Sequence, residues 1–298
     1  MKKLYGIVCA NITPMNAKGE VDFESLKKLV DTMADSGIHG VYPCGTNGEG
    51  LMLTKEEHHA IADTVIAQNA GRASCFIQCA QLSWQDTMDN IRHACAAGAD
   101  GVGVMTPTFY KADDIAMVDY YTEACQAADG KPVYMYNIAK YTNNDISVKA
   151  YAQVVNANPN CMGIKYSNSD ISRIQDYLRA PKTRKTDALI GADSLILSAL
   201  AAGCVGEVSG PACVFPKWYV GAYEAFVKGD TALALEYQNK IVACSRSIKP
   251  VPQIPAIKAM LKMLGVIKND TCRRPFRKLT ADEYKLLENA LNMYAADC

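Results

Sequence analysis

Eight short apolar runs alternate with amphipathic segments along this 298-residue chain, and this alternation constrains the fold more than any other feature. The runs cover residues 5–13, 40–45, 74–80, 101–107, 132–137, 161–165, 188–192 and 204–210. Most are continuously apolar, as the strands of a parallel sheet are when helices cover it. Eight strand-then-helix units without a linker favour an α/β fold of the (β/α)8 TIM-barrel type. A doubly wound sheet usually has fewer strands and a glycine-rich phosphate turn.

The segments between the runs carry helix signals. After Asp22, which is a suitable N-cap, apolar residues recur at helical spacing as far as Met33. Thr54 and Glu57 form a capping box for the next helix. Asp193 is expected to cap the helix that follows the seventh run.

Helical patterns continue after the last run. An eighth barrel helix is expected near residues 215–228, followed by three more near 230–247, 253–265 and 280–296. A capping box from Thr280 to Glu283 opens the last of them. The pattern therefore predicts a catalytic barrel at 1–228 and a C-terminal helical subdomain at 229–298.

The charge of the chain is balanced, with 31 Lys and Arg against 31 Asp and Glu. Such a chain has no basic excess for nucleic acid or anionic membranes, so neither partner is expected. No run reaches the roughly 18 apolar residues that span a bilayer. Asn11 and Pro14 break the apolar stretch near the N-terminus, which argues against a secretory signal and favours a cytoplasmic protein that acts on small molecules.

Cofactor and metal signals are missing from the sequence. The 12 cysteines are scattered and form no CxxC pair, and the four histidines have no metal-ligand spacing. There is no Walker loop and no GxGxxG turn, so neither a metal nor a nucleotide cofactor is expected. In a reducing compartment the cysteines within apolar runs act as small hydrophobes. Examples are Cys9, Cys75, Cys79, Cys161 and Cys204.

The ends of the predicted strands carry the chemistry, because barrel active sites lie at the C-terminal ends of the strands. These ends are GTNGEG at 45–50, TPTFY at 106–110, YNIAKY at 136–141, Lys165, and EVSG at 207–210. Taken alone, Lys165 is a solvated strand end and Tyr136 a wall residue. Together they place an amine and a phenol at one barrel mouth.

An amine held among apolar strands loses hydration, which favours its neutral, nucleophilic form. Lys165 can then attack a ketone to form an iminium, while the Tyr136 phenol shuttles protons. The backbone amides of the turn that contains Gly45 and Gly48 can hold the carboxylate of a 2-oxo acid. This combination predicts a Schiff-base aldolase.

At these residues the chain resembles the dihydrodipicolinate synthase and N-acetylneuraminate lyase superfamily over nearly its whole length. The matching segments are GIVCANITPM at 6–15, GTNGE at 45–49, TP at 106–107, YN at 136–137, GIK at 163–165 and SG at 209–210. The resemblance implies a pyruvate-type Schiff base on Lys165 and proton transfer by Tyr136. It also implies that Thr46 and Asn47 bind the pyruvate carboxylate, and Thr46 is counted among the catalytic residues. The oligomer that it implies is a homotetramer of barrels.

The chain departs from the synthase branch of this superfamily. Synthases carry a second threonine in the turn, a tyrosine after the fourth strand and an arginine that grips a carboxylate. Here those positions hold Asn47, Phe109 and Tyr141, with Tyr110 as a partial substitute. A phenol cannot replace the bidentate clamp of an arginine, so 4-hydroxy-tetrahydrodipicolinate synthase is a disfavoured alternative.

The chain also departs from the sialic acid lyases. It keeps their hydroxyl and acidic positions at Ser167 and Asp193, but Ser194 and Gly210 stand where an acid and a serine are expected. A 2-keto-3-deoxy sugar acid therefore fits best.

Such a sugar acid would meet side chains around the mouth. The expected contacts are Ser167, Ser209, Asp193 and Lys140 or Tyr141. N-acetylneuraminate lyase remains an alternative. A non-catalytic 2-oxo-acid-binding barrel is the alternative from another class.

Overall fold

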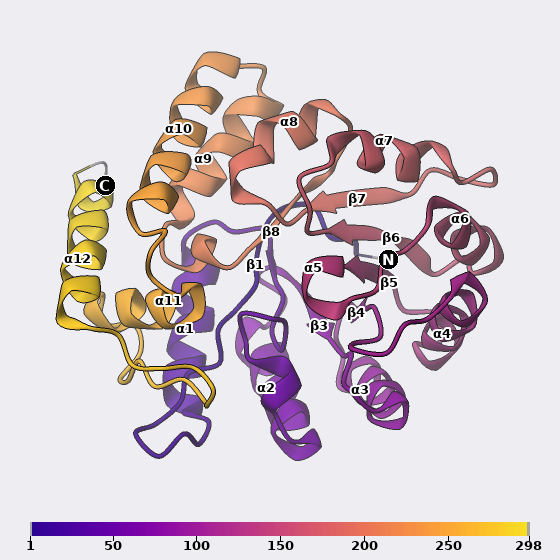
Figure 1. The fold of residues 1–298 in the computed structure, drawn as a ribbon, viewed down its shortest axis with the longest axis horizontal. Helices are drawn as coiled ribbons and strands as arrows, with labels where there is room; N and C mark the ends of the chain where they lie inside the picture. The colour runs from indigo at the N-terminus through magenta and orange to yellow at the C-terminus, as the bar shows by residue number, and fades with distance from the viewer. Residues whose placement is uncertain (1, 297–298) are drawn as a thin grey trace.

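The structure is a computed structural model that describes residues 2–296. Eight parallel strands close into a barrel in sequence order, with β8 beside β1, which confirms the predicted fold (Figure 1). The strands are β1 (Gly6–Cys9), β2 (Gly40–Val41), β3 (Ser74–Gln78), β4 (Gly101–Met105), β5 (Val133–Asn137), β6 (Cys161–Tyr166), β7 (Asp187–Ile190) and β8 (Gly206–Ser209).

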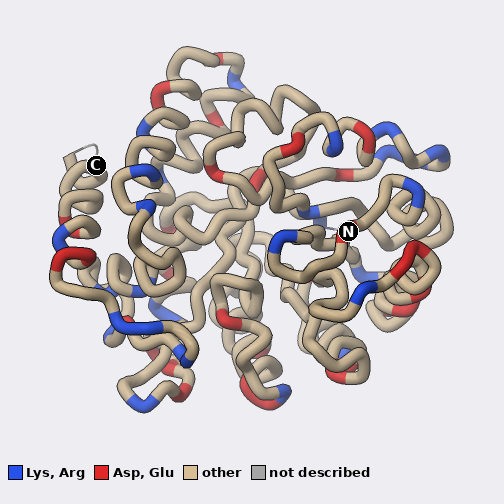
Figure 2. The backbone as a smooth tube through the Cα atoms, viewed as in Figure 1, with Lys and Arg blue, Asp and Glu red and all other residues tan. Residues whose placement is uncertain are grey.

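Helices surround this barrel. They are α1 (Phe23–Asp35), α2 (Lys55–Asn69), α3 (Trp84–Ala96), α4 (Asp114–Ala127), α5 (Ala139–Thr142), α6 (Val148–Ala157), α7 (Ile171–Arg179), α8 (Ile196–Ala201) and α9 (Pro216–Val227). Short 3-10 turns, η1 (Gly50–Met52), η2 (Asp193–Leu195) and η3 (Pro211–Cys213), follow β2, β7 and β8. Lys and Arg are interspersed with Asp and Glu around the chain (Figure 2). No helix within residues 2–296 is long and apolar enough to cross a membrane.

Two layers of buried side chains hold the barrel together. Val8, Phe76, Tyr134, Leu189 and Val208, each from a different strand, belong to one cluster that fills the barrel. Side chains alternate along a strand, so the residues between these face outward. There they pack against the helices in a second, larger cluster.

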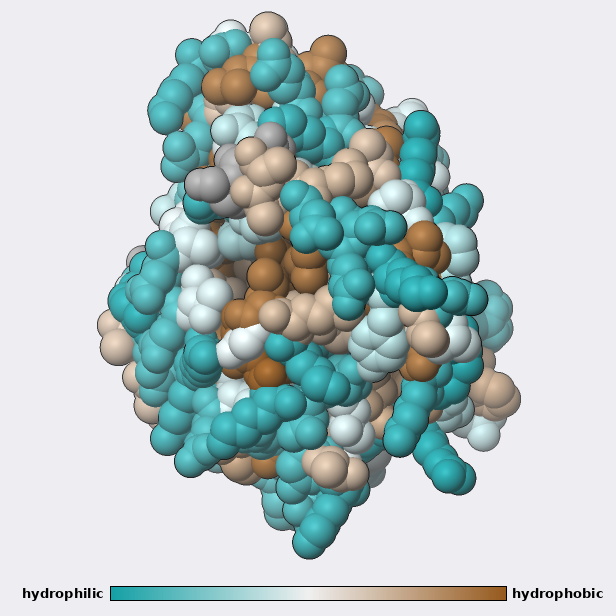
Figure 3. All heavy atoms as spheres, turned by 90° about the vertical axis from the view of Figure 1, so that its left-hand side faces the viewer, coloured by the Kyte–Doolittle hydropathy of each residue, from teal (hydrophilic) through white to brown (hydrophobic). Residues whose placement is uncertain are grey.

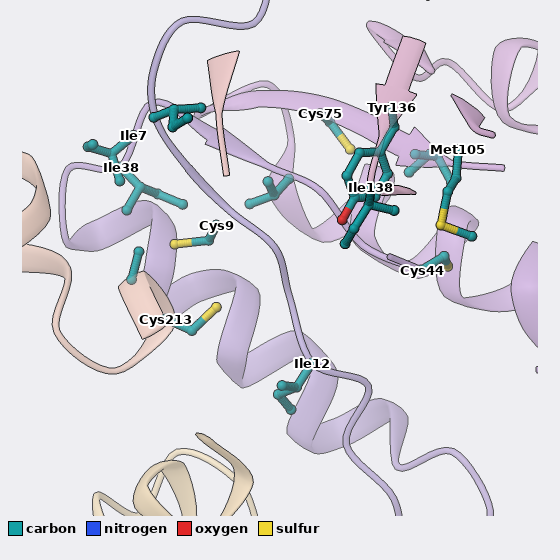
Figure 4. Packing of buried hydrophobic residues seen from close by; sticks show 14 of the residues in the cluster. Ile7, Cys9, Ile12, Ile38, Cys44, Cys75, Met105, Tyr136, Ile138 and Cys213 are labelled. Carbon is teal, nitrogen blue, oxygen red and sulfur yellow. The ribbon is translucent and has the colours of Figure 1, made fainter. Parts of the chain in front are cut away.

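The cysteines named above are buried and free, as predicted. Cys9 lies in the larger cluster, where its sulfur and that of Cys213 point toward one another near Ile7 and Ile38 (Figure 4). Burial, with a smaller effect from Cys213, raises the pKa of the Cys9 thiol well above its usual value. These thiols therefore behave as packing groups.

The first two strands fall furthest short of their apolar runs. β1 and β2 end at Cys9 and Val41, whereas the runs continue to residues 13 and 45. Pro43 has no backbone N–H to donate, and Cys44 has left-handed backbone geometry with φ of 61°. The apolar run after β2 thus bends into the turn at the barrel mouth.

Local signals set most of the predicted helix starts. Asp22 accepts a hydrogen bond from the backbone N–H of Ser25 and caps α1. The capping boxes at Thr54 and Thr280 open α2 and α12 as predicted.

The prediction that Asp193 caps a helix is wrong. Asp193 begins η2, and α8 begins at Ile196 without a side-chain cap. The Asp193 carboxylate accepts hydrogen bonds from the hydroxyls of Ser209 and Tyr219 instead. The carboxylate oxygen that would accept a helix-capping hydrogen bond is therefore occupied by hydroxyls from other parts of the chain.

Three further helices follow the barrel, close to their predicted positions: α10 (Thr231–Ser247), α11 (Gln253–Met263) and α12 (Ala281–Ala295). α10 packs along α9, and α12 packs on α11 at one side of the barrel (Figure 1). Hydrophilic side chains dominate the face that these helices form, with a hydrophobic band in a hollow near its centre (Figure 3). The predicted division after residue 228 falls between α9 and α10 and stays a prediction about folding units.

Candidate active site

The C-terminal ends of the strands surround a hollow of about 340 Å³. Its lining comprises Thr46, Asn47, Tyr136, Ile138, Lys140, Tyr141, Lys165, Ser167, Gly191, Asp193, Val208, Ser209, Gly210, Gln253, Ile254 and Phe276. Most of the residues singled out in the sequence therefore meet here. Gly45, Gly48 and Tyr110 do not line this hollow.

Lys165 points into the barrel. It pairs in register with Tyr136 of β5 and Leu189 of β7, and Leu189 belongs to the interior cluster. Lys165 is only 5% exposed. Its Nζ lies 3.9 Å from the ring centroid of Tyr136 and 4.9 Å from that of Tyr42. No carboxylate of residues 2–296 lies within 4.0 Å of Nζ, so the amine is held by aromatic faces alone.

Tyr136 and Thr46 form a hydroxyl pair beside this amine. Tyr136 is buried, and its Oη lies 3.4 Å from Thr46 Oγ1, where either atom can donate. Tyr42 lies edge-on to Tyr136, with ring centroids 6.4 Å apart. Burial, with a smaller effect from Tyr136, raises the pKa of Tyr42 well above its usual value, so Tyr42 stays a neutral wall.

The turn after β2 is tightly wound. Glu49 has left-handed geometry with φ of 57°, and a Cβ on Gly50 would lie 1.9 Å from the carbonyl oxygen of Cys44. The backbone N–H groups of Thr46 and Asn47 donate to no acceptor among residues 2–296. Unpaired successive amides of a turn are suited to bind an anion such as a carboxylate.

A buried ion pair fixes this turn from the C-terminal part of the chain. The Lys258 ammonium of α11 contacts the Glu49 carboxylate, and both side chains are 0% exposed. Lys258 also donates to the carbonyl of Thr271 at 2.9 Å, and the backbone N–H of Arg273 donates to Glu49 at 2.7 Å. In the sequence Glu49 is only one letter of the GTNGE motif, and no pattern there points to this contact.

The other end of the hollow carries polar groups. Asp193 follows β7, where its Oδ1 accepts hydrogen bonds from Ser209 Oγ and from Tyr219 Oη, the latter at 2.9 Å. Ser167 follows β6, and a Cβ on Gly191 would lie 2.1 Å from its Oγ. Gly191 therefore provides the space in which the Ser167 hydroxyl lies.

The three predicted residues outside the hollow have other surroundings. Tyr110 is 79% exposed and makes an edge-to-face contact with Phe109. The Gly48 carbonyl accepts a hydrogen bond from Thr13 Oγ1 at 2.7 Å, which ties the turn to the segment after β1. Gly45 lines a neighbouring hollow of about 180 Å³.

The lining residues from the C-terminal part of the chain were not predicted from the sequence. Gln253 and Ile254 begin α11, and Phe276 lies in the segment before α12. They have no strand-end position, which was the signal used for the other residues. Their apolar and amide side chains close the hollow on the side away from the strands.

Comparison with known proteins agrees with this geometry. The model of the Dihydrodipicolinate synthetase family matches residues 3–294. An uncharacterised DapA-like lyase of Halobacterium salinarum is 32% identical over 285 residues, which cover 96% of this chain and 92% of the relative. The chain belongs to the dihydrodipicolinate synthetase family. This confirms the resemblance drawn from the sequence.

Members of this family with different names are similar to the chain. N-acetylneuraminate lyase of Rattus norvegicus is 29% identical over 286 residues, covering 94% of this chain and 89% of that one. The crystal structure of dihydrodipicolinate synthase from Aquifex aeolicus has a TM-score of 0.92 at 26% identity, with 98% of each chain covered. Membership in the dihydrodipicolinate synthetase family thus leaves the substrate to be argued from the site.

The Asn47 side chain packs against the backbone of Gly210. A Cβ on Gly210 would lie 2.5 Å from the amide nitrogen of Asn47, so the amide occupies the space that a side chain at 210 would need. The serine expected at this position in sialic acid lyases is therefore incompatible with Asn47 as it lies here.

We expect Gly210→Ser to raise the KM for 2-oxo acids roughly tenfold, about 1.4 kcal/mol, because it displaces the Asn47 amide. The double variant Gly210→Ser with Asn47→Ser removes the clash and should recover most of this loss. Steady-state kinetics of the three proteins checks the expectation. A single variant with the wild-type KM would contradict it.

Proposed function

We propose that the protein is a class I aldolase, a carbon–carbon lyase that forms a Schiff base between Lys165 and pyruvate or another 2-oxo acid. It reversibly cleaves a 2-keto-3-deoxy sugar acid to pyruvate and an aldehyde. The observation that supports this most strongly is the buried Lys165 amine beside the Tyr136 phenol, within one hollow that also carries unpaired backbone amides.

The chemistry follows from these positions. Once it has lost its proton, the Lys165 amine attacks C2 of the substrate, and loss of water from the carbinolamine leaves an iminium. When the C4 hydroxyl gives up its proton, the C3–C4 bond breaks and the aldehyde leaves. The electron pair of the broken bond forms the enamine of pyruvate. Protonation at C3 and addition of water then release pyruvate and the free amine. Tyr136, hydrogen-bonded to Thr46, transfers the protons.

Binding of the substrate uses both ends of the hollow. The amides of Thr46 and Asn47 hold the 2-oxo acid carboxylate. Asp193, Ser167 and Ser209 contact hydroxyls at the distal end. A site built to hydrogen-bond hydroxyls rejects analogues that lack them, because its polar groups are then left unpaired.

One observation supports a second candidate, 4-hydroxy-tetrahydrodipicolinate synthase. Lys140 lines the hollow, with its Nζ 5.5 Å from the ring centroid of Tyr141. Its ammonium, one residue before the position where the synthases have arginine, supplies a positive charge for a second substrate carboxylate. Lysine is a point charge without the bidentate geometry of a guanidinium, so this candidate ranks lower.

The test is a coupled assay for pyruvate release from a panel of 2-keto-3-deoxy sugar acids, N-acetylneuraminate and 4-hydroxy-2-oxoglutarate. We expect one sugar acid to be cleaved with a kcat/KM at least about a hundredfold above the others, as hydroxyl-reading sites allow. Aspartate semialdehyde with pyruvate is the comparison in the synthetic direction. Turnover confined to that pair would favour the synthase instead.

The homotetramer stays a prediction that rests on the family. It is supported by the exposed aromatic pair Phe109 and Tyr110 on the loop after β4, since exposed apolar groups on a loop are typical of interfaces. Sedimentation equilibrium should give four times the 32.4 kDa mass of one chain.

A further inference from the structure

Glu207 is a buried acid that the proposed chemistry does not use. It lies in β8, with Ile7 of β1 and Ile190 of β7 as its register partners. Both isoleucines belong to the cluster between the barrel and the helices, so Glu207 occupies a position in an apolar layer. It is 0% exposed, and no N–H or hydroxyl donor in the part of the chain described reaches either carboxyl oxygen, although the Asp193 carboxylate lies within hydrogen-bonding reach of Glu207.

Few ionisable groups face Glu207. They are Asp193 of η2, Tyr219 of α9 and Lys165 of β6. The residues of α8 next to it, ILSALA, include no ionisable group. On the β1 side the closest thiol in register is that of Cys9, which pairs with Ser209 and is neutral because burial raises its pKa.

Two carboxylates cannot both be charged in such a site without a large cost. Burial, followed by the charge of Asp193, raises the pKa of Glu207 well above its usual value, and Lys165 offsets this only in part. A negative charge is less costly on Asp193 than on Glu207, because Asp193 lines the hollow and accepts two hydrogen bonds. Apolar surroundings are known to keep a buried carboxylic acid neutral at pH 7 in enzyme active sites.

The geometry of Asp193 leaves one oxygen for a ligand. Ser209 and Tyr219 both donate to Oδ1. Apart from the Glu207 carboxyl, no donor among residues 2–296 reaches Oδ2, and because Oδ2 is not a buried unpaired atom it remains accessible. Its carboxylate is thus held on one side and open on the other.

We propose that Glu207 is a neutral acid that positions Asp193, so that the two acids carry one negative charge, which Asp193 presents to a hydroxyl at the distal end of the substrate. The part that concerns the substrate rests on the proposed function. The neutral state of Glu207 and its pairing with Asp193 do not.

Infrared spectroscopy tests the charge state without any substrate. The difference spectrum of wild type minus Glu207→Gln at neutral pH should contain the carbonyl stretch of one protonated carboxylic acid. The exposed Glu224 of α9 is the matched control, and Glu224→Gln should remove carboxylate bands only. Carboxylate bands alone in the Glu207 difference spectrum would overturn the proposal.

Thermal unfolding gives a second readout with a definite sign. In the native chain Glu207 keeps its proton at pH values above 4.5, the ordinary pKa of glutamate, because the pKa of Glu207 is raised in the folded state. Stability from this group is complete below 4.5 and is lost as the pH rises toward the folded pKa. The Tm of each variant, Glu207→Gln and Glu207→Leu, minus the Tm of wild type should therefore increase as the pH rises. A constant difference would contradict the proposal.

Kinetics tests the effect on Asp193. With the sugar acid that the protein cleaves, the wild-type KM should rise roughly tenfold toward alkaline pH as a second charge appears behind Asp193, whereas the Gln variant stays flat. Exchange of the pyruvate methyl protons with D2O, which needs Lys165 but no distal contact, should be the same in both. A KM that rises equally in both proteins, or in neither, would overturn the positioning role. Absence of exchange would mean that the proposed function fails, while the infrared and thermal results still decide the state of Glu207.

Discussion

Replacing Lys165 by alanine should abolish covalent capture of pyruvate and lower kcat/KM for cleavage at least about a thousandfold, as expected for loss of a nucleophile. Wild-type protein treated with pyruvate and borohydride should gain one reduced pyruvate adduct on Lys165. The reason is geometric, because the Lys165 amine lies inside the hollow at 5% exposure against the Tyr136 ring. Intact-mass and peptide spectrometry measure the adduct.

Lys140 provides the matched control for this experiment. It lines the same hollow, but its surroundings are open and its Nζ lies near the Tyr141 ring, which is 59% exposed. Lys140→Ala should therefore keep the adduct on Lys165. An adduct that moves to Lys140, or none on the wild type, would favour the non-catalytic barrel.

Replacing Lys258 by methionine should cost roughly 3–5 kcal/mol of stability, because it leaves the buried Glu49 carboxylate without its partner. Denaturant unfolding monitored by circular dichroism measures this loss. Pyruvate affinity should fall with it, since Glu49 belongs to the turn that carries the Thr46 and Asn47 amides.

Two comparisons separate this effect from a general loss of charge. Lys262→Met, one turn further along α11, removes an ion pair with Asp270 in which the lysine is 45% exposed, and it should cost less than about 1 kcal/mol. The double variant Lys258→Met with Glu49→Gln removes both charges and should lose less than Lys258→Met alone. Strictly additive losses would show that the two side chains are not coupled.

The strand-end residues are the part of the site that the sequence predicts well. Parallel strands of a closed barrel bring their C-terminal ends to one mouth, so Lys165 and Tyr136 become neighbours once the strand order is known. Thr46 joins them because the turn after β2 lies at the same mouth. Periodicity and chain order are enough for this inference.

Contacts between distant segments lie beyond such reasoning. Lys258 and Glu49 are 209 positions apart, and no periodicity shows which turn of α11 meets the barrel. Asp193 has the sequence context of a cap, but two hydroxyls from β8 and α9 bind its carboxylate. Glu207 resembles a polar strand end in the sequence, and only the helices packed over β8 make it buried.

The ion pair between Glu49 and Lys258 also orders events during synthesis of the chain. All eight strands, with Lys165 and Tyr136, leave the ribosome before Gln253, Lys258 and Phe276 do. At elongation rates of about 5–20 residues per second, the roughly 49 residues from Ser209, the end of β8, to Lys258 take about 2–10 seconds. During that interval a nascent barrel has Lys165 and Tyr136 but neither the counter-ion of Glu49 in the turn after β2 nor the residues of α11 that line the hollow. The turn that carries the Thr46 and Asn47 amides therefore gains its buried counter-ion only after all eight barrel strands have been synthesised.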